Sequence, residues 1–162
     1  KKKKNNLEWK GESDFPGTQY IGIKTTCRID KMDEAMPDDF AKIELLIKNN
    51  EALATGAAYS IYHNWDIVKR QATYTACVGV TSIPEDLPED FVSGEIPATR
   101  VYTLRHTGKY DHLGNAWSTM MAMARGKEFK TKRGIHPWEQ YITNPQETES
   151  DAHITDVVFA IK

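Results

Sequence analysis

Apolar and polar residues follow a regular pattern along the first half of the chain. Strand-like segments, rich in β-branched and aromatic residues, lie at residues 20–29, 58–63 and 71–80. Between the first two, apolar residues recur every three to four positions, which indicates one helix. Pro37 suits the first turn of that helix, and Asn49 suits its end. The first half therefore predicts strand, helix, strand and strand.

The same order recurs in the second half. Strands are predicted at residues 98–106, 138–143 and 153–161. A helix with one apolar stripe is predicted between the first two of these strands. Asp111 can cap the start of this helix, and Gly126 can end it.

This repeated order predicts an internal duplication with a period of roughly eighty residues, which is too long for a solenoid. The half-repeats span about residues 16–83 and 95–162, and the acidic, proline-containing segment 82–94 connects them. Each half predicts an antiparallel sheet with one helix, too small to bury enough surface alone. We therefore predict an α+β fold: a tandem duplication of a strand-helix-strand-strand module, with a ligand groove on the pseudo-twofold axis.

The start of the chain differs from the rest. Residues 1–15 open with a run of lysines and asparagines, and we predict a linker-like polar tail before the domain at residues 16–162. An arm that binds an acidic partner or nucleic acid is the alternative for such a basic run. Because the sequence does not begin with methionine, we expect a preceding domain that is missing from this chain.

Composition narrows the classes of function. A formal net charge of −2 gives no general attraction to nucleic acid, so we expect no direct nucleic-acid binding. No apolar run reaches the roughly eighteen residues of a transmembrane helix. No hydrophobic region follows the basic start, as it would in a signal peptide. We therefore predict a cytoplasmic domain without membrane contact.

Cysteine and histidine positions predict neither a metal site nor a cofactor. Cys27 and Cys77 are far apart, each in a strand-like segment, and we predict two buried free thiols, with a disulfide as the alternative. The histidines have no metal-ligand spacing. His106 lies at the end of a predicted strand, and we expect a structural histidine with satisfied hydrogen bonds there.

The most informative segment for function is 138–145, where one carboxylate lies among large aromatic residues. Alternation along a strand puts Glu139 and Tyr141 on one face and Trp138 on the other. A carboxylate attracts cations, and aromatic faces add a cation–π attraction of about 1 to 2 kcal/mol when water is excluded. The alternative is an exposed strand glutamate, or one paired with Lys132 or Arg133.

Further aromatic residues extend this candidate site. Tyr62 is the counterpart of Tyr141 in the first half-repeat, so both are expected to face one groove. Tyr110 and Trp65 are additional candidates for the aromatic walls. Trp117 lies on the helix stripe, where packing in the core is the more common role.

Several short motifs resemble one known family. Segments 105–111 (Arg-His-Thr-Gly-Lys-Tyr-Asp) and 139–141 (Glu-Gln-Tyr), followed by Asn144-Pro145, are similar to that family, and segment 62–66 looks like the matching part of the first half. The family is the GyrI-like small-molecule-binding domain, also called the bacterial transcription-activator effector-binding domain. The resemblance implies two strand-helix-strand-strand modules around a groove that takes lipophilic, often cationic compounds, with Glu139 facing the ligand.

Two functions follow from the residues and the resemblance. The first is a sensor or sequestering module that binds a lipophilic or cationic aromatic molecule, more a binding domain than an enzyme. Glu139 and then Tyr141 are the best supported of its predicted ligand contacts, and Trp138 is weaker because it lies on the opposite face of the strand. The predicted contacts are Glu139, Tyr141, Tyr62, Tyr110, Trp138 and Trp65. The alternative is a hydrolase of cyclopropane-type electrophiles, which a branch of the family implies, with Glu139 as acid or base and Tyr141 beside it. A domain that binds a protein partner is a third interpretation.

Overall fold

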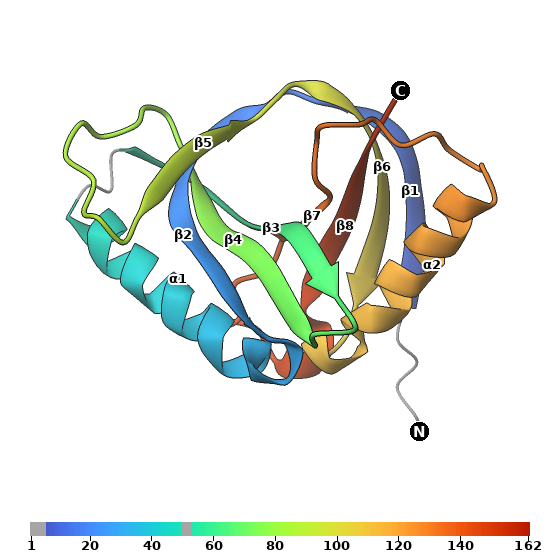
Figure 1. Cartoon of the computed structure of the whole chain (residues 1–162), viewed down its shortest axis with the longest axis horizontal. Coiled ribbons are helices and arrows are strands. Elements are labelled where there is room, and N and C mark those ends of the chain that lie inside the picture. Colours follow the sequence, from blue (N-terminus) through green and yellow to red (C-terminus); the bar gives the residue numbers. More distant parts are fainter. Residues whose placement is uncertain (1–5, 50–52) are drawn as a thin grey trace. The chain divides into compact units, whose positions relative to one another are not determined.

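The computed structural model describes residues 6–49 and 53–162, which form two compact units (Figure 1). The central unit is Pro16–Ala98. The terminal unit combines the described residues up to Phe15 with Thr99–Lys162. Each unit is an antiparallel sheet with one long helix, which confirms the predicted α+β class.

Within the described part of the chain, the central unit has four strands and one helix longer than one turn. They are β2 (Thr18–Arg28), α1 (Met32–Lys48), β3 (Ala54–Asp66), β4 (Gln71–Val80) and β5 (Val92–Ile96). The sheet order is β3-β4-β2-β5, and the short helix η1 (Ile29–Lys31) leads into α1. Figure 1 shows α1 lying along β2 and β4, the strands that it contacts.

The terminal unit repeats this arrangement. Its long elements are β1 (Asn6–Phe15), β6 (Thr99–Thr107), α2 (Leu113–Arg125), β7 (Trp138–Tyr141) and β8 (Ile154–Ile161). The sheet order is β1-β6-β8-β7, and α2 contacts β6 and β8. One-turn helices η3 (Tyr110–His112) and η4 (Ser150–Ala152) precede α2 and β8. Each unit thus contains strand, helix, strand and strand, with the last strand between the other two.

Each unit also has an additional edge strand, and both of these strands correct the sequence prediction. Residues 6–15, predicted as a polar tail, form β1 and pair with β6. Residues 92–96 belong partly to the predicted connector, yet they form β5 and pair with β2. The pattern of apolar residues did not predict either strand, because both contain many polar residues. An edge strand with one face exposed to water needs few apolar positions.

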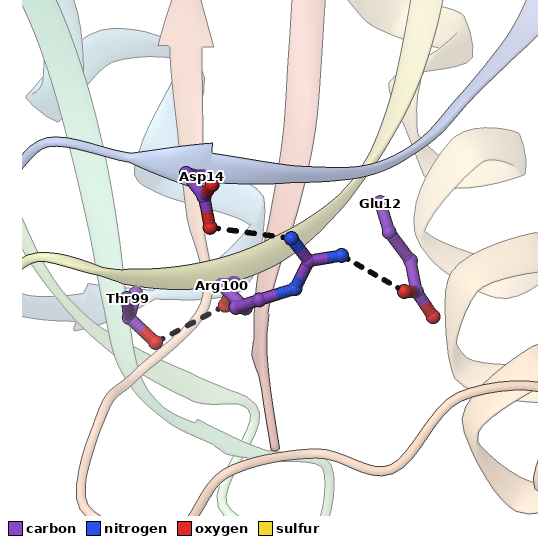
Figure 2. Close-up of polar contacts among 4 residues, drawn as sticks. All are labelled: Glu12, Asp14, Thr99 and Arg100. Carbon is purple, nitrogen blue, oxygen red and sulfur yellow. Dashed lines mark hydrogen bonds and ion pairs between the residues drawn. The ribbon is translucent and has the colours of Figure 1, made fainter.

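An exposed ion-pair network joins β1 to β6. Figure 2 shows Arg100 of β6 between two carboxylates of β1. Its Nη2 lies 3.1 Å from Glu12 Oε2, and its Nη1 lies 3.2 Å from Asp14 Oδ1. Hydrogen bonds to both carboxylates raise the pKa of the Arg100 guanidinium. Because these side chains face water, the network contributes to strand register more than to stability.

The connection from β1 into β2 requires a glycine. Gly17 has a φ of +84°, in the left-handed region that favours glycine. A Cβ atom there would lie 2.8 Å from the backbone nitrogen of Ala98, which is too close for any other residue. The chain therefore passes Gly17 in close contact with the segment that leaves β5.

Helix α1 begins earlier than the sequence predicted. It starts at Met32, and Pro37 lies inside it rather than in its first turn. Proline cannot donate the backbone hydrogen bond of a helix interior, so packing must compensate for the lost bond. The apolar face of α1 supplies this packing. Its residues Met32, Met36, Phe40, Ile43 and Ile47 pack against Ile23, Tyr74 and Ala76 of the sheet in the core of the central unit.

A buried acid lies on the same face of α1. The Asp39 side chain turns to the sheet and is 7% exposed. Its Oδ2 accepts hydrogen bonds from Thr25 Oγ1 at 2.8 Å and from the Tyr74 hydroxyl at 2.7 Å. Burial, and then the bond to Asp39, raises the pKa of Tyr74 well above its usual range. This network closes the polar part of the central core.

Two further sequence predictions concern the cysteines and membrane-spanning helices. Cys27 and Cys77 are both free, Cys77 is buried, and Cys27 is only partly buried. Burial raises the pKa of both thiols. No helix within residues 6–49 and 53–162 is both long and apolar enough to cross a membrane.

Removing the Tyr74 hydroxyl should destabilise the protein. Tyr74→Phe leaves the buried Asp39 carboxylate with one donor fewer, and an unmet buried hydrogen bond costs about 1–3 kcal/mol. Urea denaturation followed by circular dichroism measures the change. Thr26→Val is the matched control: it removes an exposed hydroxyl bonded to Thr73, and we expect a change within about 0.5 kcal/mol. Equal stability of Tyr74→Phe and wild type would contradict a structural role for this network.

Candidate functional site

Strand β7 positions the candidate carboxylate. Glu139 and Tyr141 are opposite Val157 and Thr155 of β8. Because side chains alternate along a strand, both residues lie on the sheet face that carries Val157. Val157 belongs to the core that packs against α2, together with Leu104 and Met120. Glu139 therefore lies on the helix-covered face of the terminal unit.

The Glu139 carboxylate is buried and accepts hydrogen bonds from the neutral side chains of Trp117 and Tyr141. It is 4% exposed. The Trp117 indole Nε1 donates to Oε2 at 2.7 Å, and the Tyr141 hydroxyl donates to Oε1 at 2.8 Å. Hydrogen bonds to an ionised acceptor are short and strong, so these two stabilise the negative charge and set the orientation of the carboxylate.

Aromatic rings continue from Tyr141 towards the surface. The Tyr110 ring meets the Tyr141 ring edge-on, with centroids 6.1 Å apart, and stacks on the His153 ring at 4.4 Å. Tyr110 is 36% exposed. Burial, and then the negative charge of Glu139, raises the pKa of the Tyr110 hydroxyl. We refer to Glu139, Trp117, Tyr141, Tyr110 and His153 as the Glu139 cluster.

Trp138 takes the opposite face of β7, as alternation predicts. Its side chain is fully buried, and its ring packs against Phe15 of β1 with centroids 5.0 Å apart. The structure therefore places Trp138 in a packing position away from the Glu139 carboxylate.

Two predicted aromatic contacts belong to the central unit. Tyr62 and Trp65 lie on β3, where their rings meet edge-on with centroids 6.4 Å apart. Of the predicted ligand contacts, the structure thus brings together Glu139, Tyr141 and Tyr110. A role for Tyr62 and Trp65 at a ligand stays a prediction.

The sequence analysis underestimated Trp117. We expected it in the core, and it does pack there against Phe159, but its indole also bonds to Glu139. A buried indole N–H needs an acceptor, so a tryptophan on a core-facing helix stripe was a signal for a nearby carboxylate. The alternative that Glu139 is an exposed strand residue is wrong, because α2 covers it.

His106 is also not the satisfied histidine that we expected. It is fully buried on β6, but none of the described residues gives either ring nitrogen a hydrogen-bond partner. Burial, and then the charge of His112, lowers its pKa. In the parts of the chain that the structure describes, no three His, Cys, Asp or Glu side chains group as metal ligands.

Comparison with solved structures shows the same fold in a protein solved in complex with DNA and in a protein bound to a small molecule. The chain superposes on EcmrR in a cryo-EM structure of the EcmrR–DNA complex (TM-score 0.77, 18% identity), covering 98% of this chain and 57% of EcmrR. It superposes on the crystal structure of the EcmrR C-terminal domain (TM-score 0.71, 18% identity), covering 98% of this chain and 97% of that domain. SAV2435 bound to tetraphenylphosphonium is similar too (TM-score 0.65, 13% identity, 96% and 94% covered).

At these identities the structures show a shared fold. The chain spans little more than half the length of EcmrR and nearly all of its C-terminal domain. No protein sequence of curated function matches this chain. The family described as the GyrI-like small molecule binding domain, in contrast, matches residues 12–162. This chain therefore belongs to the GyrI-like small-molecule-binding domain family.

Proposed function

We propose that this domain binds lipophilic aromatic cations and that Glu139 supplies the charge that attracts them. The observation that carries the proposal is a buried carboxylate that accepts hydrogen bonds from two neutral aromatic side chains, Trp117 and Tyr141. The ligand of SAV2435, tetraphenylphosphonium, is a lipophilic cation and supports this class of compound.

The energetics favour a cation at such a site. At an effective dielectric constant of about 20, unit charges about 4 Å apart attract each other by roughly 4 kcal/mol. A lipophilic cation loses little hydration on burial, so most of this attraction remains. The neutral donors orient the carboxylate without cancelling its charge. A metal or ammonium ion, in contrast, would have to shed strongly bound water.

The aromatic members of the cluster suit the organic part of the ligand. Tyr110 and Tyr141 offer ring faces and edges next to the carboxylate, and cation–π contacts contribute about 0.5–2 kcal/mol each. We include Tyr62 and Trp65 as further proposed aromatic contacts, as the sequence predicts, and leave out Trp138 because it is buried against Phe15 on the opposite face of β7.

We place this binding in a sensing or sequestering role in the cytoplasm. The likeness to the C-terminal domain of EcmrR, a protein solved in complex with DNA, supports a sensor attached to a DNA-binding domain. In that arrangement the preceding domain contacts DNA, and this domain contacts only the small molecule.

A hydrolase that uses Glu139 as acid or base is the weaker alternative. Both carboxylate oxygens already accept a hydrogen bond, which orients the group for electrostatic attraction. A general base must also reach a water or a substrate proton within about 2.6–3.2 Å. The geometry therefore favours binding over turnover.

Removing the charge of Glu139 should weaken the binding of tetraphenylphosphonium. For Glu139→Gln we expect at least a tenfold increase in Kd, measured by isothermal titration calorimetry, because about 1.4 kcal/mol corresponds to a factor of ten. Tetraphenylborate has the same shape with the opposite charge, so the wild-type preference for the cation should shrink in this variant.

Glu128→Gln provides the control for that experiment. It removes an exposed carboxylate from the same unit and should leave both dissociation constants unchanged within about twofold, because exposed charges are screened. If Glu139→Gln binds the cation as tightly as wild type, the proposed role of the carboxylate is wrong.

The binding role also predicts an absence of catalysis. Incubation with an electrophilic cyclopropane compound, followed by chromatography, should give the same rate of loss for wild type and Glu139→Ala. A wild-type rate at least 100-fold above that of the variant, a range typical of general acid–base catalysis, would replace the binding role by the hydrolase alternative.

A further inference from the structure

Two neighbouring buried side chains of the terminal unit have no hydrogen-bond partner among the described residues. His106 of β6 and Thr155 of β8 are directly opposite each other in the sheet, and both are 0% exposed. Among the described residues, none bonds to His106 Nδ1, His106 Nε2 or Thr155 Oγ1. His153, two residues before Thr155 in the chain, also has an Nδ1 without a partner among the described residues. His106 and Thr155 are thus adjacent buried polar side chains without hydrogen-bond partners in the described part of the chain.

Burying these polar atoms is unfavourable unless another group forms hydrogen bonds with them. A buried polar group without a partner costs about 1–3 kcal/mol, and native structures contain few of them. The lowered pKa keeps the His106 ring neutral near pH 7, so one nitrogen donates and the other accepts. The Thr155 hydroxyl can do both. The matching partner is a group that donates and accepts, such as a hydroxyl.

The corresponding cross-strand residues of the central unit do have hydrogen-bond partners. We call such a line of directly opposite residues across a sheet a row. In the central unit, Thr25 of β2 is opposite Tyr74 of β4, which is opposite Tyr62 of β3. Asp39 of α1 accepts hydrogen bonds from the first two. This row corresponds in sheet order to His106 on β6, Thr155 on β8 and Tyr141 on β7.

Helix α2 offers no such acceptor to the terminal row. Its buried residues are Leu113, Ala116 and Met120, all of them apolar. Thr25 and Tyr74 are therefore satisfied within the central unit, whereas none of the described residues bonds to the side chains of their counterparts in the terminal unit, His106 and Thr155. The difference lies on the helix, since the strand pairing is the same.

The open row is continuous with the Glu139 cluster. Thr155 is directly opposite Tyr141, whose hydroxyl bonds to Glu139. His153 stacks on Tyr110 of the same cluster. With strands about 4.8 Å apart, Thr155 and His106 lie about 5 and 10 Å across the sheet from Tyr141. A drug-sized molecule can span these distances.

We propose that His106 and Thr155 form a hydrogen-bonding subsite beside the Glu139 cluster, and that it takes a hydroxyl group of the ligand. This inference rests on the proposed function, and it narrows the ligand class to aromatic cations with a hydroxyl within about 10 Å of the charge. Glu139 attracts the positive charge of the ligand, while the ligand hydroxyl forms hydrogen bonds with the ring nitrogen atoms of His106 and with Thr155 Oγ1.

A matched pair of probes tests the subsite. Tetraphenylphosphonium and (4-hydroxyphenyl)triphenylphosphonium differ by one hydroxyl group. We expect the hydroxyl compound to bind about fivefold more tightly to wild type, the effect of one ordinary hydrogen bond. In Thr155→Val, which keeps the shape of the side chain, and in His106→Leu, this ratio should fall to about one.

Control variants separate the subsite from general effects on the fold. Thr103→Val removes another buried hydroxyl, on β6 but on the opposite face from His106, and should keep the wild-type ratio. His106→Gln keeps a donor and an acceptor and should retain part of the preference. The wild-type ratio needs no variant, so the test holds even if a substitution prevents folding.

The outcomes distinguish this inference from the proposed function. If tetraphenylphosphonium binds in a Glu139-dependent way but the hydroxyl brings no gain, the open atoms hold only ordered water and the inference is wrong. A gain that survives both Thr155→Val and His106→Leu also overturns it. If neither phosphonium ion binds, the proposed function itself fails.

Discussion

The burial of one carboxylate organises the terminal unit. Trp117 and Tyr141 each donate a hydrogen bond to one oxygen of Glu139, which stabilises the carboxylate in its buried position under α2. An ionised group without such donors would be strongly disfavoured there. This arrangement depends on the position of α2 on the sheet and on the register of β7 against β8. A shift of one residue in β7 would turn the Glu139 side chain to the other face of the sheet. Tyr110 extends the same arrangement outwards.

The two units solve one problem in different ways. Each places a carboxylate beneath its helix and surrounds it with hydroxyl and aromatic groups. In the central unit the acid comes from the helix, as Asp39, and its partners Thr25 and Tyr74 satisfy it within the protein. Ser60, the counterpart of Glu139 in the sheet, instead donates to the sulfur of Met36 at 3.3 Å. The terminal unit takes its acid from the strand, which leaves polar positions on the neighbouring strands open. A similar framework thus supports a closed core in one unit and a candidate binding site in the other.

Strand β1 joins the two ends of the chain in one unit. It precedes β2 in the chain but completes the terminal sheet beside β6. The central unit, in contrast, is one continuous segment, Pro16–Ala98, in which β5 pairs with β2. The terminal sheet therefore depends on pairing between strands of high sequence separation, which forms more slowly than local pairing.

Apolar periodicity alone determined the order of strands and helices, because burial of one face imposes a repeat of two on strands and of 3.6 on helices. It also placed Glu139 and Tyr141 on one face of one strand. It could not find β1 and β5, whose pairing depends on partners distant in sequence rather than on local pattern. The bond from Trp117 and the open atoms of His106 and Thr155 were likewise decided only by tertiary structure. Which polar group receives a partner depends on the side chains that the packed helix presents to the sheet: Asp39 on α1 supplies one, and the buried residues of α2 do not.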